Sequence, residues 1–271
     1  MKPYHSLFII LLVFVSCKET KTETAIIEEV VLEENVIETI EETTQTSFEV
    51  TPISHATMVL QWDGKVIYVD PVGGKDAFAG QPAPDIIVVT DIHGDHFNME
   101  TLAAVATNDT KIIMPRAVAD KATVLQSQTM VLNNGETTTF SEFTGFSFEA
   151  IPMYNLREEA LKFHPKGRGN GYVIEKSGHR VYISGDTEDI PEMRQLEDID
   201  VAFVAMNLPY TMTVKNAASA VVDFKPKKVY PYHYRGADSF SHVGLFKTWI
   251  KKSSAWKDVT VVTLDWYPSK E

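Results

Sequence analysis

Short apolar runs separated by tight turns occupy most of the chain. The stretch TMVLQWDGKVIYVDP contains two β-rich runs joined by Asp-Gly, a dipeptide typical of two-residue hairpins, and it ends with Asp70 and a proline. Farther along, GYVIEKSGHRVYISGDT repeats this arrangement with a Ser-Gly turn and leads to Asp186. The pattern predicts two hairpins, each of which places an aspartate at the end of a strand.

Two further runs, PDIIVVTDIHGDH and DIDVAFVAMNLP, pass through consecutive aliphatic residues and end in polar ones. Continuous apolar runs suit strands that are covered on both faces. Helical patterns separate the strands at 98–107, at 213–224 with Thr213 as N-cap, and at 239–251. This alternation predicts an α/β (α+β) protein, a four-layer αββα sandwich whose polar strand ends converge at one edge.

Composition separates the N-terminal end of the chain from this globular part. Residues 1–17, MKPYHSLFIILLVFVSC, join one positive charge to an apolar run of about ten residues, the plan of a secretory signal and too short for a membrane span. The chain's single cysteine, Cys17, ends a segment that resembles a lipobox, with Phe14 where leucine is usual. We therefore expect a lipoprotein-type signal peptide and a domain anchored by lipid in a bacterial cell envelope, facing the periplasm or the outer membrane. Ordinary signal cleavage and a retained anchor are the alternatives.

Residues 18–47 are rich in Glu, Thr and Ile and hold nine Glu against two Lys, so they account for about −7 of the formal net charge of −12. This composition suits an acidic tether, although an amphipathic helix can also be drawn through it. The remaining residues, 48–271, are expected to form one catalytic domain. No basic stripe or motif indicates nucleic-acid binding.

The stretch DIHGDH places His93, Asp95 and His96 on a turn that leaves a buried strand. Imidazole and carboxylate are preferred ligands of borderline divalent metals, and residues this close on a turn can face neighbouring ions. A helix N-terminus capped by Asp95 is the alternative, but capping does not require two histidines. The stretch therefore predicts a metal site.

Four motifs, VTDIHGDH, FHPKGRGNGYVI, YISGDTEDIPEM and VYPYHYRG, resemble in this order the metallo-β-lactamase superfamily. Its hallmark is a His-x-His-x-Asp-His loop followed by more distant His, Asp and His ligands of two metal ions, here called site one and site two. The resemblance covers residues 48–271 and is greatest to the branch of L-ascorbate-6-phosphate lactonase and, more distantly, N-acylphosphatidylethanolamine phospholipase D.

The resemblance implies metal-binding roles for residues that match the motif. His93 corresponds to a site-one ligand, Asp95 and His96 to site-two ligands, Asp186 to the aspartate that bridges both ions, and His233 to the last site-two ligand. Asp95 also corresponds to the catalytic residue that orients the attacking hydroxide and passes on its proton.

Two positions depart from the family pattern. Asp91 replaces the first histidine of the loop and is expected to donate an oxygen to site one. Asn155 stands near the expected position of the remaining site-one histidine, and His164 is the nearest substitute. Oxygen-rich ligation widens the expected metals from zinc to manganese or iron. Substrate or supporting contacts are expected from a further set, which is His55, Asp70, Asn155, Arg168 and Arg235.

Such a site implies a hydrolase that uses a metal-bound hydroxide on a lactone, ester or phosphodiester of a small molecule or lipid. An alternative is an envelope protein that binds metal or ligand without turnover, favoured by the altered Asp91 and Asn155. A true β-lactamase is a third hypothesis, which the different ligands of its second site disfavour. No G-x-S-x-G elbow and no second cysteine support covalent catalysis. The oligomeric state has no signal in the sequence.

Overall fold

The computed structural model describes residues 47–268. The expected signal peptide, Cys17 and all but the last residue of the tether lie outside the described residues. Within the described part, no helix has the length and apolar character needed to cross a membrane.

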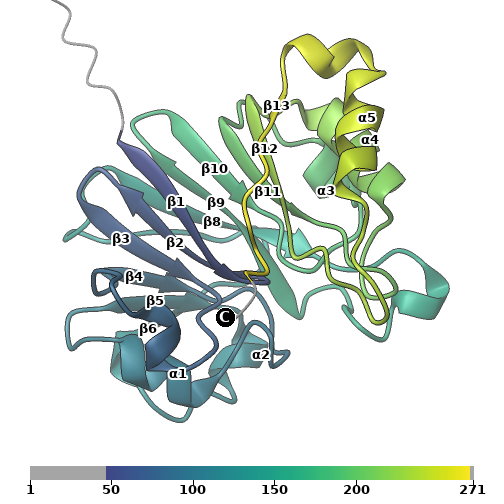
Figure 1. The fold of residues 1–271 in the computed structure, drawn as a ribbon. Coiled ribbons are helices and arrows are strands. Elements are labelled where there is room, and N and C mark those ends of the chain that lie inside the picture. The colour runs from purple at the N-terminus through teal and green to yellow at the C-terminus, as the bar shows by residue number, and fades with distance from the viewer. Residues whose placement is uncertain (1–46, 269–271) are drawn as a thin grey trace, which may run out of the picture. The chain divides into compact units, whose positions relative to one another are not determined.

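Two β-sheets form the centre of the described domain (Figure 1). The first sheet has six strands in sequential order: β1 (Phe48–Ser54), β2 (Thr57–Trp62), β3 (Lys65–Val69), β4 (Ile86–Val88), β5 (Lys111–Met114) and β6 (Thr129–Val131). The second has seven in the order β13 to β7: β7 (Thr137–Thr139), β8 (Phe146–Met153), β9 (Gly169–Lys176), β10 (His179–Ile183), β11 (Val201–Ala205), β12 (Lys228–Tyr232) and β13 (Thr260–Val261).

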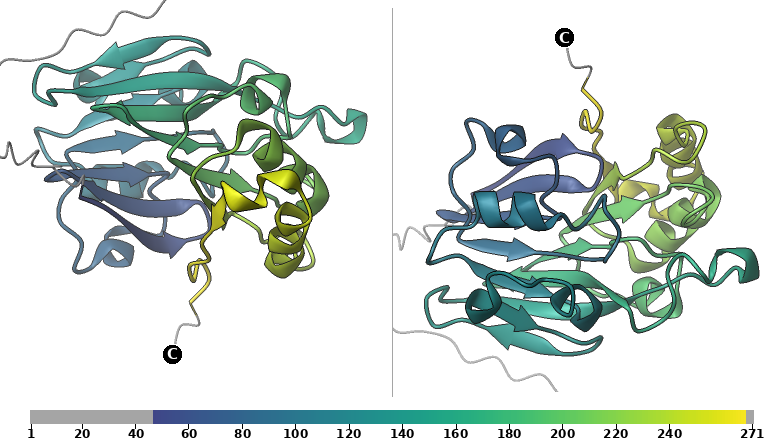
Figure 2. Two further views of the ribbon diagram at one scale, coloured as in Figure 1. Left: turned by 90° about the horizontal axis from the view of Figure 1, so that it is seen from above. Right: turned by 90° about the horizontal axis from the view of Figure 1, so that it is seen from below.

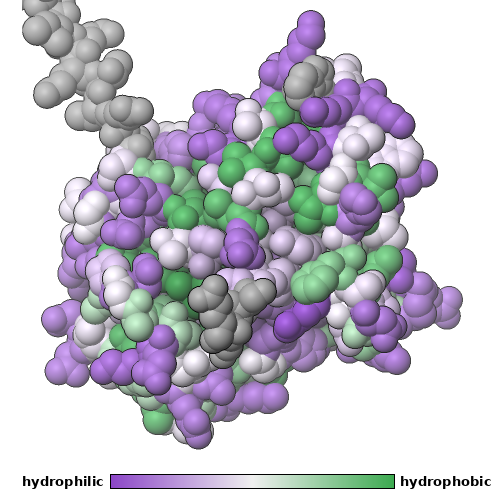
Figure 3. Space-filling model, in the orientation of Figure 1, coloured by the Kyte–Doolittle hydropathy of each residue, from purple (hydrophilic) through white to green (hydrophobic). Residues whose placement is uncertain are grey.

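Helices cover the outer faces of both sheets, as Figure 2 shows from above and below. The α-helices are α1 (Met99–Val105), α2 (Arg116–Ala119), α3 (Pro191–Arg194), α4 (Val214–Phe224) and α5 (Val243–Lys251). Short 3-10 helices lie at Lys75–Phe78, Gln126–Gln128, Glu158–Ala160 and Ser254–Lys257. Hydrophilic residues occupy much of the face in Figure 3, with apolar patches between them.

Three apolar clusters hold these layers together. Trp62 of the first sheet and Phe148 and Phe203 of the second share the cluster between the sheets. Separate clusters join the first sheet to α1 and α2, and the second sheet to α3, α4 and α5. The sequence-based expectation of an αββα sandwich is therefore confirmed.

Each sheet contains one of the two predicted hairpins, and both hairpins are confirmed. β2 pairs antiparallel with β3 through Asp63 and Gly64, whose φ angles are 47° and 75°. β9 pairs antiparallel with β10 through Ser177 and Gly178 at 52° and 79°. Positive φ at both turn positions matches the right-handed twist of paired strands. Parallel strands then extend each sheet, as β3-β4-β5 and β10-β11-β12.

The predicted helices are present, but two predicted boundaries are wrong, since α1 ends at Val105 rather than at 107 and the third helix starts later than expected. Asn98 caps α1 by accepting a hydrogen bond from the Thr101 N–H, and Thr213 caps α4 in the same way. The third helix begins at Val243 rather than at 239, because the preceding residues form an isolated antiparallel bridge between Arg235 and Phe240.

The carboxyl ends of the central strands meet at one edge, where they deliver polar residues. Asp70 follows β3, the DIHGDH loop follows β4, Asp186 follows β10, and His233 follows β12. This is the edge at which α/β sheets place their sites.

Gly171 permits the close approach of β9 to the end of β10. A Cβ atom at this position would lie 2.9 Å from the Ile183 carbonyl oxygen and 3.0 Å from that of Ser184. We expect Gly171→Ala to lower the free energy of unfolding by about 1–3 kcal/mol in urea denaturation followed by tryptophan fluorescence. Gly94→Ala, which meets nothing within 4 Å, is the control. Equal stability of both variants would contradict this packing.

Candidate functional site

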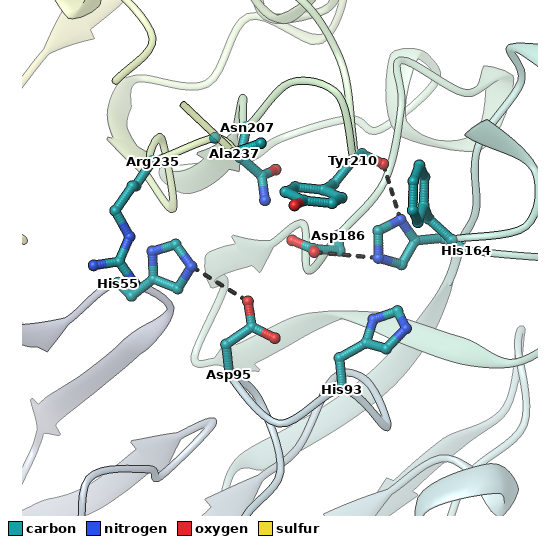
Figure 4. Close-up of a pocket in the computed structure, with 11 residues that line it drawn as sticks. His55, His93, Asp95, His164, Asp186, Asn207, Tyr210, Arg235 and Ala237 are labelled. Atoms are coloured by element: carbon teal, nitrogen blue, oxygen red, sulfur yellow. Dashed lines mark hydrogen bonds and ion pairs between the residues drawn. The ribbon is translucent and has the colours of Figure 1, made fainter. Parts of the chain in front are cut away.

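A cleft of about 440 Å³ opens at the converging strand ends, a size suited to small molecules. Histidine and aspartate side chains line one side, and loop residues line the rest (Figure 4). The lining includes His55, Asp95, His164, Asp186, Asn207 and Arg235. These residues come from distant parts of the sequence, so the cleft exists only in the folded domain.

Three buried residues form a central cluster, which we define as His96, Asp186 and His233. The Nε2 atoms of the two histidines lie 3.1 Å apart. Asp186 Oδ2 is 3.4 Å from His96 Nε2, and Asp186 Oδ1 is 3.3 Å from His233 Nε2. All three side chains therefore direct ligand atoms at one small volume.

The spacing of this cluster fits a divalent metal ion. Tetrahedral ligands at about 2.1 Å from an ion lie about 3.4 Å from one another, and the central separations run from 3.1 to 3.4 Å. Asp186 Oδ1 is buried and has no hydrogen-bond partner among the described residues, which is costly for a carboxylate oxygen unless a cation compensates it. The residues present thus suit the ion that the sequence predicts.

Asp95 lies beside the central cluster. Its Oδ2 atom is 3.4 Å from His233 Nε2, and its Oδ1 atom is 4.0 Å from His96 Nε2. Burial raises the pKa of Asp95, but hydrogen bonds from His233 and His55 and the charge of His96 hold it far below the usual value. Asp95 is therefore an anion that faces both the cluster and the cleft.

A buried carboxylate orients His96. His96 Nδ1 lies 2.7 Å from Asp70 Oδ2, and this oxygen also accepts a hydrogen bond from the Thr90 hydroxyl at 2.6 Å. The Thr90 backbone N–H donates to the other Asp70 oxygen at 2.7 Å. Because a carboxylate only accepts, His96 donates from Nδ1 and turns the Nε2 lone pair toward the cleft.

His164 has the same tautomer for a different reason. Its Nδ1 lies 3.1 Å from the Tyr210 carbonyl oxygen, which can only accept a hydrogen bond. Asn155 donates to the Tyr210 and Ala160 carbonyls, so it fixes the loop behind His164. His164 Nε2 accepts or donates no hydrogen bond within residues 47–268 and lies 3.2 Å from Asp186 Oδ2. The structure thus brings His164 to the cleft, while Asn155 remains behind it.

Charge couples the members of the central cluster. Burial raises the pKa of Asp186, but the charges of His233 and His96 hold that pKa well below its usual value. Burial lowers the pKa of His96, and the charges of Asp186 and Asp70 reverse this and raise it well above the usual value. The central cluster therefore favours positive charge between its side chains, and a divalent cation bound there would compete with protons for the histidine Nε2 atoms.

Asp95 and Tyr267 fix the tautomer of His55. The Tyr267 hydroxyl accepts a hydrogen bond from the Arg235 backbone N–H at 3.0 Å and lies 2.7 Å from His55 Nδ1. His55 Nε2 lies 3.3 Å from Asp95 Oδ2, an ionised oxygen that can only accept, so Nε2 carries the proton of the neutral ring. Nδ1 is then the acceptor, and the Tyr267 hydroxyl, whose pKa is raised by burial, donates to it. Burial also lowers the pKa of His55 and so keeps it neutral. His55 therefore holds Asp95 in place rather than offering a lone pair to a metal.

Three site residues have left-handed backbones. The φ angles are 58° at His55, 46° at Asp70 and 45° at His233. Such angles cost free energy for residues other than glycine and concentrate at functional sites. The surrounding packing holds these three side chains at the edge of the cleft.

The Asp91 carboxylate lies between His93 and Arg168, and its Oδ2 atom is 3.9 Å from His164 Nε2. His93 Nδ1 lies 2.7 Å from Asp91 Oδ2, and Arg168 approaches both carboxylate oxygens, at 3.2 Å from Nε and 3.0 Å from Nη2. Burial raises the pKa of Asp91, and the hydrogen bond from His93 and nearby positive charges reverse this, so that the pKa falls below its usual value. Arg168 thus contacts Asp91, whereas Arg235 lines the cleft itself.

The predicted site residues therefore occupy different places around the cleft. His93, Asp95, His164, Asp186 and Arg235 line it, and His96 and His233 are buried in the central cluster. Whether each of them binds a metal directly stays a prediction.

Sequence reasoning assigned no individual role to four residues of this site, which are Thr90, Asn207, Tyr210 and Tyr267. Thr90 lies within the VTDIHGDH motif but is not of a ligand type, and the other three lie outside the four motifs. Thr90 and Asn207 follow buried strands, which is the only sequence signal that could have drawn attention to them.

Comparison with known proteins places the chain in a family. A profile of the Beta-lactamase superfamily domain matches residues 49–233. A UPF0173 metal-dependent hydrolase of Thermococcus onnurineus is 33% identical over 183 residues, which are 63% of this chain and 77% of that protein.

Solved structures agree with this placement. The crystal structure of a Parabacteroides distasonis protein assigned as a metal-dependent hydrolase is 39% identical and has a TM-score of 0.71, and the match covers 80% of this chain and 93% of that one. Igni18, a metallo hydrolase of Ignicoccus hospitalis, is 21% identical and shares the fold with a TM-score of 0.66 over 80% of this chain and 94% of its own.

The chain therefore belongs to the metallo-β-lactamase superfamily, as its motifs predicted, and is a metal-dependent hydrolase of that fold. The narrower branch of lactonases and phospholipases D stays a prediction.

Removal of the Tyr267 hydroxyl tests the chain of hydrogen bonds that ends at Asp95. We expect Tyr267→Phe to weaken zinc binding about tenfold, because loss of a contact behind a ligand commonly costs 10–100-fold. Competition with a chromophoric chelator measures this affinity. Tyr234→Phe is the control, since the Tyr234 ring packs against Tyr267. An unchanged affinity in Tyr267→Phe would show that His55 and Asp95 are held by other contacts.

Proposed function

We propose that this protein hydrolyses an ester-type bond in a small substrate, with a lactone, a carboxylic ester and a phosphodiester as the candidate classes. The observation that carries the proposal is the convergence of two Nε2 atoms and a shared carboxylate within 3.4 Å in the central cluster. The hydrolase relatives support turnover rather than binding alone.

His96, Asp186 and His233 would hold the ion, with Asp95 beside them. A divalent cation in such a site acidifies water toward neutral pH and polarises the substrate oxygen. Asp95, ionised and half-buried, is placed to accept a proton at its Oδ1 or Oδ2 atom. His55 would keep the carboxylate in this orientation. Zinc is the first candidate metal, with manganese and iron as alternatives.

Arg235 and Asn207 favour a substrate with an anionic or strongly polar group. In Figure 4 both lie across the cleft from His93, toward the side of His55. The guanidinium group of Arg235 lies over the Tyr267 ring, 5.4 Å from its centre, and this residue is exposed. A guanidinium group at this position can contact a carboxylate or phosphate oxygen while the ester-type bond faces the central cluster.

Asp186→Ala tests the proposal most directly. We expect hydrolysis to fall at least about a thousandfold together with loss of bound metal, since both Asp186 oxygens face the ion position. A lactone, a carboxylic ester and a phosphodiester of similar size, each with and without an added carboxylate, form the substrate panel, with a cephalosporin to detect β-lactamase activity. Asp120→Ala, at an exposed helix end, is the control.

Two outcomes would overturn the proposal. Metal binding without hydrolysis of any panel member would favour an envelope protein that binds without turnover. Full activity of a folded Asp186→Ala protein would remove the central cluster from the reaction.

Lipid attachment at Cys17 would place this activity at a bacterial membrane. The signal-like segment and the acidic tether in the sequence support the proposal. We expect mass spectrometry of the membrane fraction to find a mature chain that begins with lipid-modified Cys17. A soluble product that begins at another residue would contradict it.

A further inference from the structure

A second group of possible ligands lies beside the central cluster. We define it as the side cluster, Asp91, His93 and His164, whose ligand atoms lie within 4.8 Å of one another. Asp91 is fully buried, whereas the His93 side chain is 40% exposed. By residue type alone, this group could hold a second divalent ion.

The side cluster already contains a cation. The Arg168 Nη2 atom donates to Asp91 Oδ2 at 3.0 Å and to the Phe163 carbonyl oxygen, and it lies 3.5 Å from His93 Nε2. Nε of the same guanidinium donates to Asp91 Oδ1 at 3.2 Å. Both carboxylate oxygens are therefore engaged by one planar group, the geometry in which arginine binds carboxylates best.

This arrangement leaves little for a metal ion to bind. Asp91 Oδ2 also accepts from His93 Nδ1 at 2.7 Å, so its lone pairs are shared between two donors. His93 Nε2, which is the remaining ligand atom of that ring, lies 3.5 Å from the positively charged Nη2 atom of Arg168. An arriving cation would meet a fixed positive charge and would have to break a buried ion pair.

The central cluster differs in this respect. The partners of the Asp186 carboxylate are ring nitrogens of His96, His164 and His233. Histidine nitrogens can lose a proton and become ligands, whereas a guanidinium group stays charged at all accessible pH values. A metal ion can therefore replace protons on the histidine nitrogens of the central cluster. It cannot neutralise the guanidinium group of Arg168 in the side cluster.

We infer that Arg168 takes the place of a second metal ion, so that the chain binds one divalent cation tightly, in the central cluster. Arg168 acts as a positioning residue. Its charge balances Asp91, and Asp91 in turn orients His93 at the wall of the cleft. The inference depends on the proposed function in one respect, which is that the central cluster binds a divalent ion.

Metal stoichiometry of the full chain tests this directly. We expect isothermal titration of chelator-treated protein with zinc, and separately with manganese, to reveal one tight equivalent per chain. A second equivalent should bind at least about a hundredfold more weakly. Elemental analysis after gel filtration should give one ion per chain. Two equivalents of similar affinity would overturn the inference.

Substitution of Arg168 tests its role. Arg168→Met leaves the Asp91 carboxylate free, so a second equivalent should appear with an affinity raised at least about tenfold over the wild type. Arg168→Lys keeps the charge and should stay close to one equivalent. Arg116→Met, which removes an exposed arginine far from the cleft, is the control. One equivalent in a folded Arg168→Met protein would show that another feature excludes the second ion.

Thermal stability gives an independent measurement. Without metal, Arg168→Met leaves a buried carboxylate unpaired, so its melting temperature should fall below that of the wild type. Excess manganese should raise the variant's melting temperature by more than that of the wild type, because an ion that binds the native state stabilises it. Equal shifts would argue against a new site. Complete absence of metal binding by the wild type would instead overturn the proposed function.

Discussion

Three histidines of the site, two of them buried, are oriented by one kind of interaction, a hydrogen bond from the Nδ1 atom to an oxygen that can only accept. Asp70 receives this bond from His96, the Tyr210 carbonyl from His164, and Asp91 from His93. Each bond fixes a tautomer and sets the direction of the opposite ring nitrogen. The two sheets serve this geometry, because they bring strand ends from opposite halves of the chain to one edge.

The fold could be predicted from the sequence to a large extent. The hairpins, the buried strands and the N-caps of two helices follow from local patterns, since turn residues and apolar runs act over a few positions. The start of α5 could not be predicted in this way. The bridge between Arg235 and Phe240 holds the preceding segment out of the helix, and such a contact leaves no periodic signal.

The site could be predicted less completely. His96, Asp186 and His233 stand in motifs whose residue types already suggest metal ligation. Arg168 and Tyr267 act through contacts 77 and 212 positions away in the sequence, and no local pattern encodes these pairings. Asp91 shows the limit most clearly. Its residue type suggests a metal ligand, but in the folded domain its carboxylate pairs with Arg168.

The left-handed backbones of His55, Asp70 and His233 have a consequence for the evolution and engineering of this domain. Each of them costs about 1 kcal/mol or more relative to a relaxed conformation. Glycine would relieve this cost, so a search for thermostable variants that ignores activity would be drawn to these positions. It would thereby remove the side chains that make the cleft reactive. Selection for a hydrolase therefore has to accept a less stable domain at the points where its chemistry is located.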